Sequence, residues 1–174
     1  EKVNSAVKSA LLRDGSDLGY IEMKSLSEIQ AVSLAEKHLI SPEFAARREG
    51  TALLLSSDES VSIMLCEEDH IRIQVIKAGL ALEQAYAEAD KIDTILDGKL
   101  KYAFDERIGY LTQCPTNLGT AMRASVFALS FSRSVFWPRY MPKPCSALSS
   151  NRELHHAGPW PSAFVQYGLV APGL

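Results

Sequence analysis

Three short apolar runs in the middle of the chain constrain the fold more than any other feature. Residues 51–56 and 61–66 are mostly apolar and are joined by the polar turn Ser57-Asp58-Glu59, a pattern typical of a β-hairpin. Residues 71–76 alternate Ile, Arg, Ile, Gln, Val and Ile, which predicts a third strand with one buried face. Adjacent strands of this kind favour an antiparallel sheet.

Helical periodicity surrounds these strands. Residues 2–13 and 80–97 repeat apolar side chains with helical spacing, and Ser41-Pro42 is an N-cap followed by proline at the first helical position. Ser25 to Glu28 form a capping-box pattern that predicts a helix to about His38. The expected apolar side of that helix carries Ile29, Val32, Ala35 and Leu39. The sequence therefore predicts an α+β fold, an antiparallel sheet flanked by helices.

The stretch from Tyr110 to Val126 has the composition of a binding loop. A short strand is followed by Cys114-Pro115, a polar loop with Gly119, and an apolar run that we expect to start a helix. Backbone N–H groups at such a helix start favour anions, and Arg123 in its first turn would add a forked donor for phosphate. The alternative is an ordinary strand-to-helix connection with one surface arginine.

A second stretch, Cys66-Glu-Glu-Asp-His-Ile-Arg72, lies between the last two predicted strands. The two stretches together resemble the ATP:guanidino phosphotransferases, the family of creatine and arginine kinases, and most of all the bacterial protein-arginine kinases. That family carries Asn-Glu-Glu-Asp-His-hydrophobic-Arg and Cys-Pro-(Ser/Thr)-Asn-hydrophobic-Gly-Thr-Gly-hydrophobic-Arg-Ala. The resemblance runs from about Leu26 to Val126, and residues 36–42, Glu-Lys-His-Leu-Ile-Ser-Pro, match a further bacterial-type signature.

Two adjacent acids suit chemistry on a guanidinium group. A guanidinium is a planar fork of donors and a poor nucleophile until a carboxylate aligns it and takes a proton. Glu67 and Glu68 could supply this, although two acids in a hairpin loop could also be a solvated turn. The resemblance implies that Glu68 is the catalytic glutamate, that Glu67 lies near magnesium, and that Cys114 is the reactive cysteine beside the guanidinium.

The resemblance also implies ATP and Mg²⁺ as cofactors, with no direct metal ligand among the matched residues. Arg72 and Arg123 match positions that contact ATP phosphates, and His70 matches a residue beside the nucleotide. Asn117 and Gly119 belong to the same expected nucleotide-binding set.

Several departures weaken the match. Cys66 stands where the family usually has Asn, and Ala121 where it usually has Gly. The family's upstream Ser-Ser-Arg-Val-Arg and downstream Arg-Gly segments have no counterpart. We therefore expect this chain to be weakly active or inactive, since phosphoryl transfer depends on such charged contacts.

The last part of the chain differs in composition. Residues 127–174 contain six of the eight prolines, both tryptophans and one acid, Glu153. We interpret residues 1–126 as a partial guanidino kinase catalytic domain and residues 127–174 as a divergent tail, either disordered or read out of frame after a frameshift near Val126. Translating the encoding DNA in the other two frames tests the frameshift. Cys145, His155 and His156 lack the ligand spacing of a metal site.

The composition limits the class of protein and the cellular compartment that we expect. No apolar run approaches the length of a membrane span, the net charge of −3 gives no reason to expect nucleic acid, and no Cys-x-x-Cys pair is present, which favours a cytoplasmic protein. The resemblance implies a stress-response kinase that acts on exposed arginines of proteins, with an activator protein, a heat-shock repressor and a Clp chaperone as partners. The alternatives are a small-molecule guanidino kinase and a non-catalytic partner-binding fragment.

Overall fold

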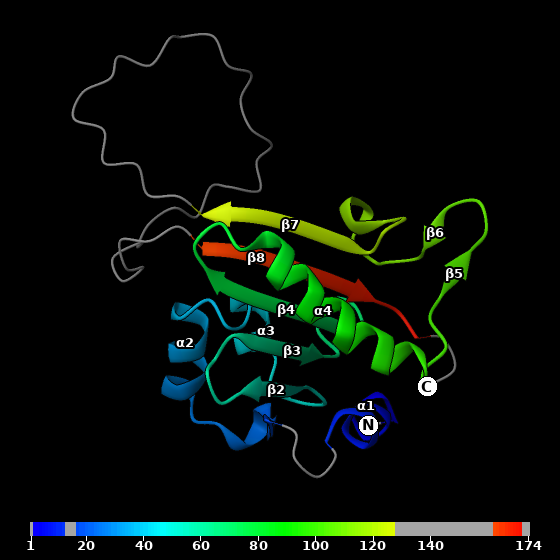
Figure 1. Ribbon diagram of the computed structural model, residues 1–174. Helices are drawn as coiled ribbons and strands as arrows, with labels where there is room; N and C mark the ends of the chain where they lie inside the picture. Colours follow the sequence, from blue (N-terminus) through cyan, green and yellow to red (C-terminus); the bar gives the residue numbers. More distant parts are fainter. Residues whose placement is uncertain (1, 13–16, 128–161, 172–174) are drawn as a thin grey trace, which may run out of the picture.

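A six-stranded antiparallel sheet with helices on both faces forms the framework of the protein (Figure 1). The computed structural model describes residues 2–12, 17–127 and 162–171. The strands lie in the order β1-β2-β3-β4-β8-β7. Their bounds are β1 Leu18–Glu22, β2 Ala52–Ser56, β3 Val61–Leu65, β4 Ile71–Ala78, β7 Met122–Phe127 and β8 Ser162–Leu169. The α+β prediction is confirmed.

The predicted hairpin and third strand form the centre of the sheet. β2 pairs with β3, and β3 pairs with β4, in antiparallel register. On β4, Ile71, Ile73 and Val75 are buried on one face while Arg72 and Gln74 lie on the other. Gln74 is itself buried, so the strand is enclosed on both sides, which is more than the alternating pattern predicts.

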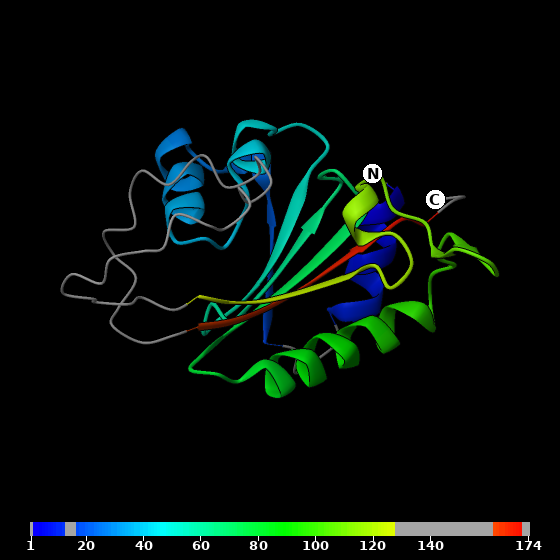
Figure 2. The same ribbon diagram turned by 90° about the horizontal axis from the view of Figure 1, so that it is seen from above.

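The first face of the sheet is covered by α1 (Lys2–Leu11) and α4 (Leu82–Asp97), which Figure 2 shows on one side of the strands. Both helices follow their predicted periodicity. Val7 of α1 and Ala85, Ala89 and Leu96 of α4 are fully buried against the strands in one hydrophobic core. Tyr86 and Ile95, predicted on the apolar side of α4, are 45% and 47% exposed because they lie at the margins of that side.

The second face carries a smaller core under η1 (Met23–Ser25), α2 (Glu28–Glu36) and α3 (Pro42–Ala46). Phe44 of α3 is fully buried there, together with Met23, Leu53 and Met64. Ser41 caps α3 as predicted, since its hydroxyl accepts from the backbone N–H of Phe44.

The start of α2 differs from the sequence prediction. The capping box is formed by Ser27 and Gln30, and Ser25 instead ends η1. The helix therefore presents Ala31 to the core, while Ile29 and Val32 are 82% and 47% exposed. The error arose because the sequence offers two overlapping Ser-x-x-Glu/Gln patterns two residues apart.

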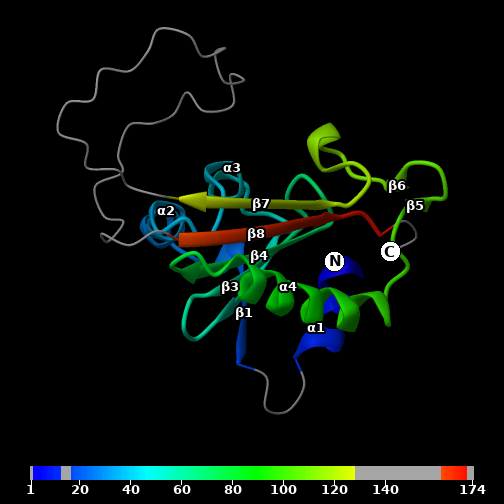
Figure 3. The same ribbon diagram turned by 45° about the horizontal axis from the view of Figure 1, so that its top comes forward.

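The largest difference lies after the binding loop. The expected helix that carries Arg123 is wrong, because residues 122–127 form strand β7, which pairs with β8 at the edge of the sheet (Figure 3). Met-Arg-Ala-Ser-Val does alternate apolar and polar residues, so the strand signal was present in the sequence. β8 comes from the segment interpreted as a tail, whereas residues 128–161, including Cys145, His155 and His156, lie outside the described ranges.

A small hairpin completes the described fold. β5 (Phe104–Asp105) and β6 (Gly109–Tyr110) pair with each other, and the 3-10 turn η2 (Pro115–Asn117) follows. Among the described residues, no helix has the length and apolar character needed to span a membrane.

We expect the second core to depend on Phe44. Phe44→Ala should lower the free energy of unfolding by about 3–5 kcal/mol, because it empties a fully buried site. Ile29→Ala on the neighbouring helix should change it by less than about 0.5 kcal/mol, since Ile29 is 82% exposed. Urea unfolding of both variants measures the difference, and equal losses would contradict the placement of α2.

Candidate active site

The acid loop closes the turn between β3 and β4. The backbone N–H of Cys66 donates to the carbonyl oxygen of His70 at 2.9 Å, which places Glu67, Glu68 and Asp69 in a tight turn at the end of the β3–β4 pair. The sequence pattern of two apolar strands with a short polar connection thus positions the three acids together.

Glu67 is held by several donors. Its Oε1 accepts from Ser41 Oγ at 2.7 Å and from Arg72 Nη1 at 2.9 Å, and its Oε2 accepts from the backbone N–H of Glu68 at 3.0 Å. Burial of the carboxyl opposes its ionisation, but the hydrogen bonds from Ser41, Glu68 and Arg72 outweigh burial, so the pKa of Glu67 lies below its ordinary value. Glu67 is therefore a fixed carboxylate.

Glu68 is exposed, and its side chain makes no hydrogen bond or ion pair with the described residues. Its carboxylate is thus available to a ligand, whereas that of Glu67 is already occupied. The two adjacent acids are thus distinguished by their surroundings, and the roles that the resemblance implies for them stay predictions.

Asp69 ties the acid loop to the cysteine loop. Its side chain is buried, and Oδ1 accepts from the backbone N–H of Gln113 at 2.8 Å. Gly168 of β8 lies directly against Oδ2, where a Cβ atom would overlap it. The two sequence stretches that carry the family resemblance are therefore in contact, next to Cys114.

The cysteine loop is organised by local hydrogen bonds. Cys114 is partly buried, with Sγ 2.9 Å from Thr116 Oγ1, and Asn117 is buried beside it. Gly119 exchanges two backbone hydrogen bonds with Tyr110, so its N–H is occupied within the protein. The expected array of N–H groups at a helix start is consequently absent from this described segment.

The two predicted phosphate-binding arginines lie on the same face of the sheet. Arg72 Nη2 donates to Gln166 Oε1 of β8 at 3.1 Å, and Arg123 of β7 is directly opposite Gln166 in the register. Strand spacing places the two Cα atoms about 12 Å apart. Arg72 Nε is buried without a hydrogen-bond partner among the described residues, while Arg123 is exposed.

His70 is tied to the end of β8. Its Nδ1 accepts from the backbone N–H of Ala171 at 3.1 Å, so in the neutral ring the proton is on Nε2. This contact is structural, and a role beside the nucleotide stays a prediction.

Both departures from the family pattern coincide with unusual backbone geometry. Cys66 and Ala121 have φ values of +62° and +54°, in the left-handed region. The family's Asn and Gly at these positions are the residues that adopt this region at least cost. The loop conformation therefore matches the family residues better than the residues present.

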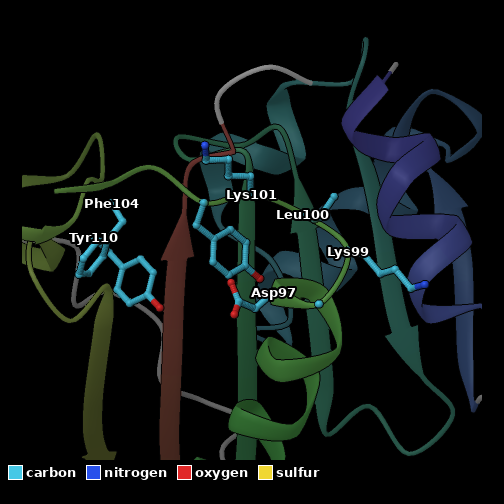
Figure 4. Close-up of a pocket in the computed structure, with 8 residues that line it drawn as sticks. Asp97, Lys99, Leu100, Lys101, Phe104 and Tyr110 are labelled. Carbon is cyan, nitrogen blue, oxygen red and sulfur yellow. The ribbon is translucent and has the colours of Figure 1, made fainter. Parts of the chain in front are cut away.

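A separate hollow of about 600 Å³ lies at the C-terminal end of α4 (Figure 4). Asp97, Leu100, Tyr102 and other residues up to Tyr110 line it, and none is a predicted site residue. The rings of Phe104 and Tyr110 meet edge to face at 5.1 Å, and Lys99 and Lys101 extend in different directions. Among the predicted residues, Arg72 is bonded to Glu67 of the acid loop, and Cys114 follows Gln113, whose N–H donates to Asp69. No cluster of three or more His, Cys, Asp or Glu suited to a metal occurs among the described residues.

Residues 1–129 match the family described as ATP:guanido phosphotransferase, C-terminal catalytic domain, and the chain belongs to this family. It is 47% identical over 127 residues to the protein-arginine kinase of Halothermothrix orenii, which covers 72% of this chain and 36% of the relative. It is 50% identical over 125 residues to that of Brevibacillus brevis, covering 72% and 35%. The chain thus spans about a third of the length of these relatives.

Solved structures agree on the fold. The substrate-free duplicated taurocyamine kinase from Schistosoma mansoni superposes with a TM-score of 0.60 at 24% identity, covering 71% of this chain and 19% of that one. Lombricine kinase gives a TM-score of 0.59 at 20% identity, covering 74% and 40%. The predicted catalytic-domain fold is confirmed.

Sequence reasoning missed three residues that build the site. Ser41 was predicted only as a helix cap, Asp69 was given no role, and Gln166 lies in the segment interpreted as a tail. The position of Asp69 within the acid stretch was a usable signal. The contacts of Ser41 and Gln166 join residues 26 and 94 positions apart, which no local pattern reveals.

We expect Gly168 to be essential for closing the site. Gly168→Ala should lower the free energy of unfolding by about 1–3 kcal/mol, because the new Cβ overlaps Asp69. Gly19→Ala is the matched control in β1: its Cβ would meet Leu55 O at 3.7 Å, an ordinary contact, and stability should change by less than about 0.5 kcal/mol. A neutral Gly168→Ala in thermal unfolding would refute the position of β8 beside Asp69.

The backbone at Cys66 yields a second expectation. Cys66→Asn should raise the free energy of unfolding by about 1 kcal/mol, since Asn tolerates the left-handed conformation at φ +62°. Cys114→Asn is the control: Cys114 has φ −84°, so no such gain is expected. Denaturant midpoints compare the two variants, and a gain at both positions or at neither would count against the backbone explanation.

Proposed function

We propose that this chain handles the nucleotide and the guanidinium in a protein-arginine kinase, which transfers the γ-phosphoryl group of Mg-ATP to arginine side chains in proteins. The main support is the arrangement of the acid loop, where an exposed Glu68, without a side-chain partner in the described ranges, adjoins a fixed Glu67–Arg72 pair. About half of the aligned residues are identical to those of protein-arginine kinases over most of this chain. This similarity supports the choice of protein arginine as substrate.

The residues present fit a triphosphate. Arg72 has a buried Nε to which no described residue bonds, and Arg123 offers an exposed guanidinium on the same face of the sheet. The two arginines would hold phosphate oxygens. Glu67 would lie near the magnesium ion, but the residues present would not supply a complete set of ligands for that ion. Bound magnesium supplies neutralisation of phosphate charge.

The chemical role assigned to Glu68 follows from its exposed carboxylate, which has no partner among the described residues. Its carboxylate pairs with the substrate guanidinium, orients one nitrogen toward the γ-phosphorus and accepts the proton that this nitrogen loses. The N–P bond forms as the bond from phosphorus to the β–γ bridging oxygen breaks, and ADP leaves. Cys114 contacts Thr116 and follows Gln113, whose backbone N–H donates to Asp69 of the acid loop, and it would border the guanidinium.

A non-catalytic fragment that binds partners is a second candidate. It is favoured by the left-handed backbone at Ala121, φ +54°, in the loop expected to bind phosphate. The protein-arginine kinase proposal also includes a cytoplasmic stress-response role, with an activator protein, a heat-shock repressor and a Clp chaperone as partners.

The decisive experiment is incubation of the full chain with labelled Mg-ATP and an arginine-rich polypeptide, with free arginine in parallel, scored as acid-labile phosphate. We expect label on the polypeptide. Glu68→Gln should reduce it at least about 100-fold with Mg-ATP binding retained, because it removes the proton acceptor. Glu106→Gln, an exposed acid in the β5–β6 hairpin, should have no effect.

Each other outcome selects an alternative. Label on free arginine alone would indicate a small-molecule guanidino kinase. No label from a folded chain would indicate the non-catalytic fragment, and full activity of Glu68→Gln would remove Glu68 from the proposed mechanism.

A further inference from the structure

Both ends of α3 contact the same residue of the acid loop. At the N-terminus, Ser41 Oγ donates to Glu67 Oε1 at 2.7 Å while it accepts from the backbone N–H of Phe44 at 3.1 Å. At the C-terminus, Arg47 Nη1 donates to the backbone carbonyl of Glu67 at 2.9 Å. One short helix therefore holds Glu67 by its side chain and by its backbone.

The helix is itself fixed to the sheet. Phe44 is fully buried in the second core against Leu53 and Met64 of the adjacent strands. Thr51, at the start of β2, donates through Oγ1 to the carbonyl of Arg47 at 2.7 Å and is also buried. The contacts of Ser41 and Arg47 thus connect the acid loop to a rigid part of the structure.

The contact of Ser41 constrains Glu68 through Glu67. Glu67 Oε2 accepts the backbone N–H of Glu68, and Glu68 has no side-chain partner of its own among the described residues. The hydrogen bond from the Glu68 N–H holds the backbone from which the Glu68 side chain extends, so a shift of the Glu67 carboxylate would displace that backbone. Without Ser41, the Glu67 carboxylate retains Arg72 Nη1 of β4 and the backbone N–H of Glu68 as donors, and it loses its only side-chain contact with α3.

We propose that Ser41 and Arg47 form a clamp on the acid loop, in which the Ser41 hydroxyl is a positioning residue for Glu67 and, through it, for Glu68. The inference rests on the proposed function, because the position of Glu68 matters to the reaction only if Glu68 meets the guanidinium. It assigns to α3 a role beyond packing, and it makes the serine at the start of this helix part of the catalytic arrangement.

The test compares three variants of the full chain. Ser41→Ala removes both the cap of α3 and the donor to Glu67, whereas Ser41→Thr keeps both. Ser27→Ala removes the matching cap of α2 without touching the acid loop. NMR relaxation gives the order parameters of the amides of Glu67 and Glu68, and steady-state assays with Mg-ATP and the arginine-rich polypeptide give kcat and KM.

We expect Ser41→Ala to lower the two order parameters from about 0.85 toward 0.6 and to reduce kcat about tenfold, with KM for Mg-ATP within about twofold of wild type. Ser41→Thr should restore both values, and Ser27→Ala should leave them unchanged despite a comparable loss of stability. Unchanged order parameters in Ser41→Ala would overturn the clamp. A wild-type chain without turnover would overturn the proposed function instead, and the relaxation data would still decide the clamp.

Discussion

A carboxylate that is largely removed from water needs hydrogen-bond donors. The side chain of Glu67 is only 9% exposed, and much of this structure depends on supplying donors to it. Its donors come from the start of α3, from β4 and from the loop itself. Satisfying one buried charge therefore fixes a helix, a strand and a turn relative to one another. The neighbouring Glu68 is exposed, and its side chain has no partner in the part of the chain that the structure describes.

Strand β8 imposes the second constraint. It pairs with β4 on one side and with β7 on the other, so Arg72 and Arg123 are brought to one face of the sheet by a segment that is distant in sequence from both. The same strand supplies Gln166, which accepts from Arg72, and Gly168, whose lack of a Cβ leaves room for Asp69. Just after the strand, Ala171 donates its backbone N–H to His70. Stability and site geometry are thus coupled through one strand.

The errors of sequence interpretation have physical causes. Arg123 was expected in a helix because Met122 to Val126 are compatible with both periods, and pairing with β8 decided in favour of a strand. Ile29 and Val32 were expected to be buried, yet a cap two residues later turns them toward solvent. In both cases two local patterns overlapped: pairing with β8 selected the strand, and the Ser27–Gln30 capping box set the start of α2.

The sequence alone determined the hairpin of β2 and β3, the adjoining β4, the amphipathic helices α1 and α4, the cap at Ser41 and the family, because side-chain periodicity, caps and motifs are local properties. Only the tertiary structure decided that Ser41 binds Glu67, that Asp69 binds the cysteine loop and that Gln166 binds Arg72. These contacts join residues far apart in the chain. Their formation depends on packing and on the pairing of buried polar groups, neither of which has a signature in a short stretch of sequence.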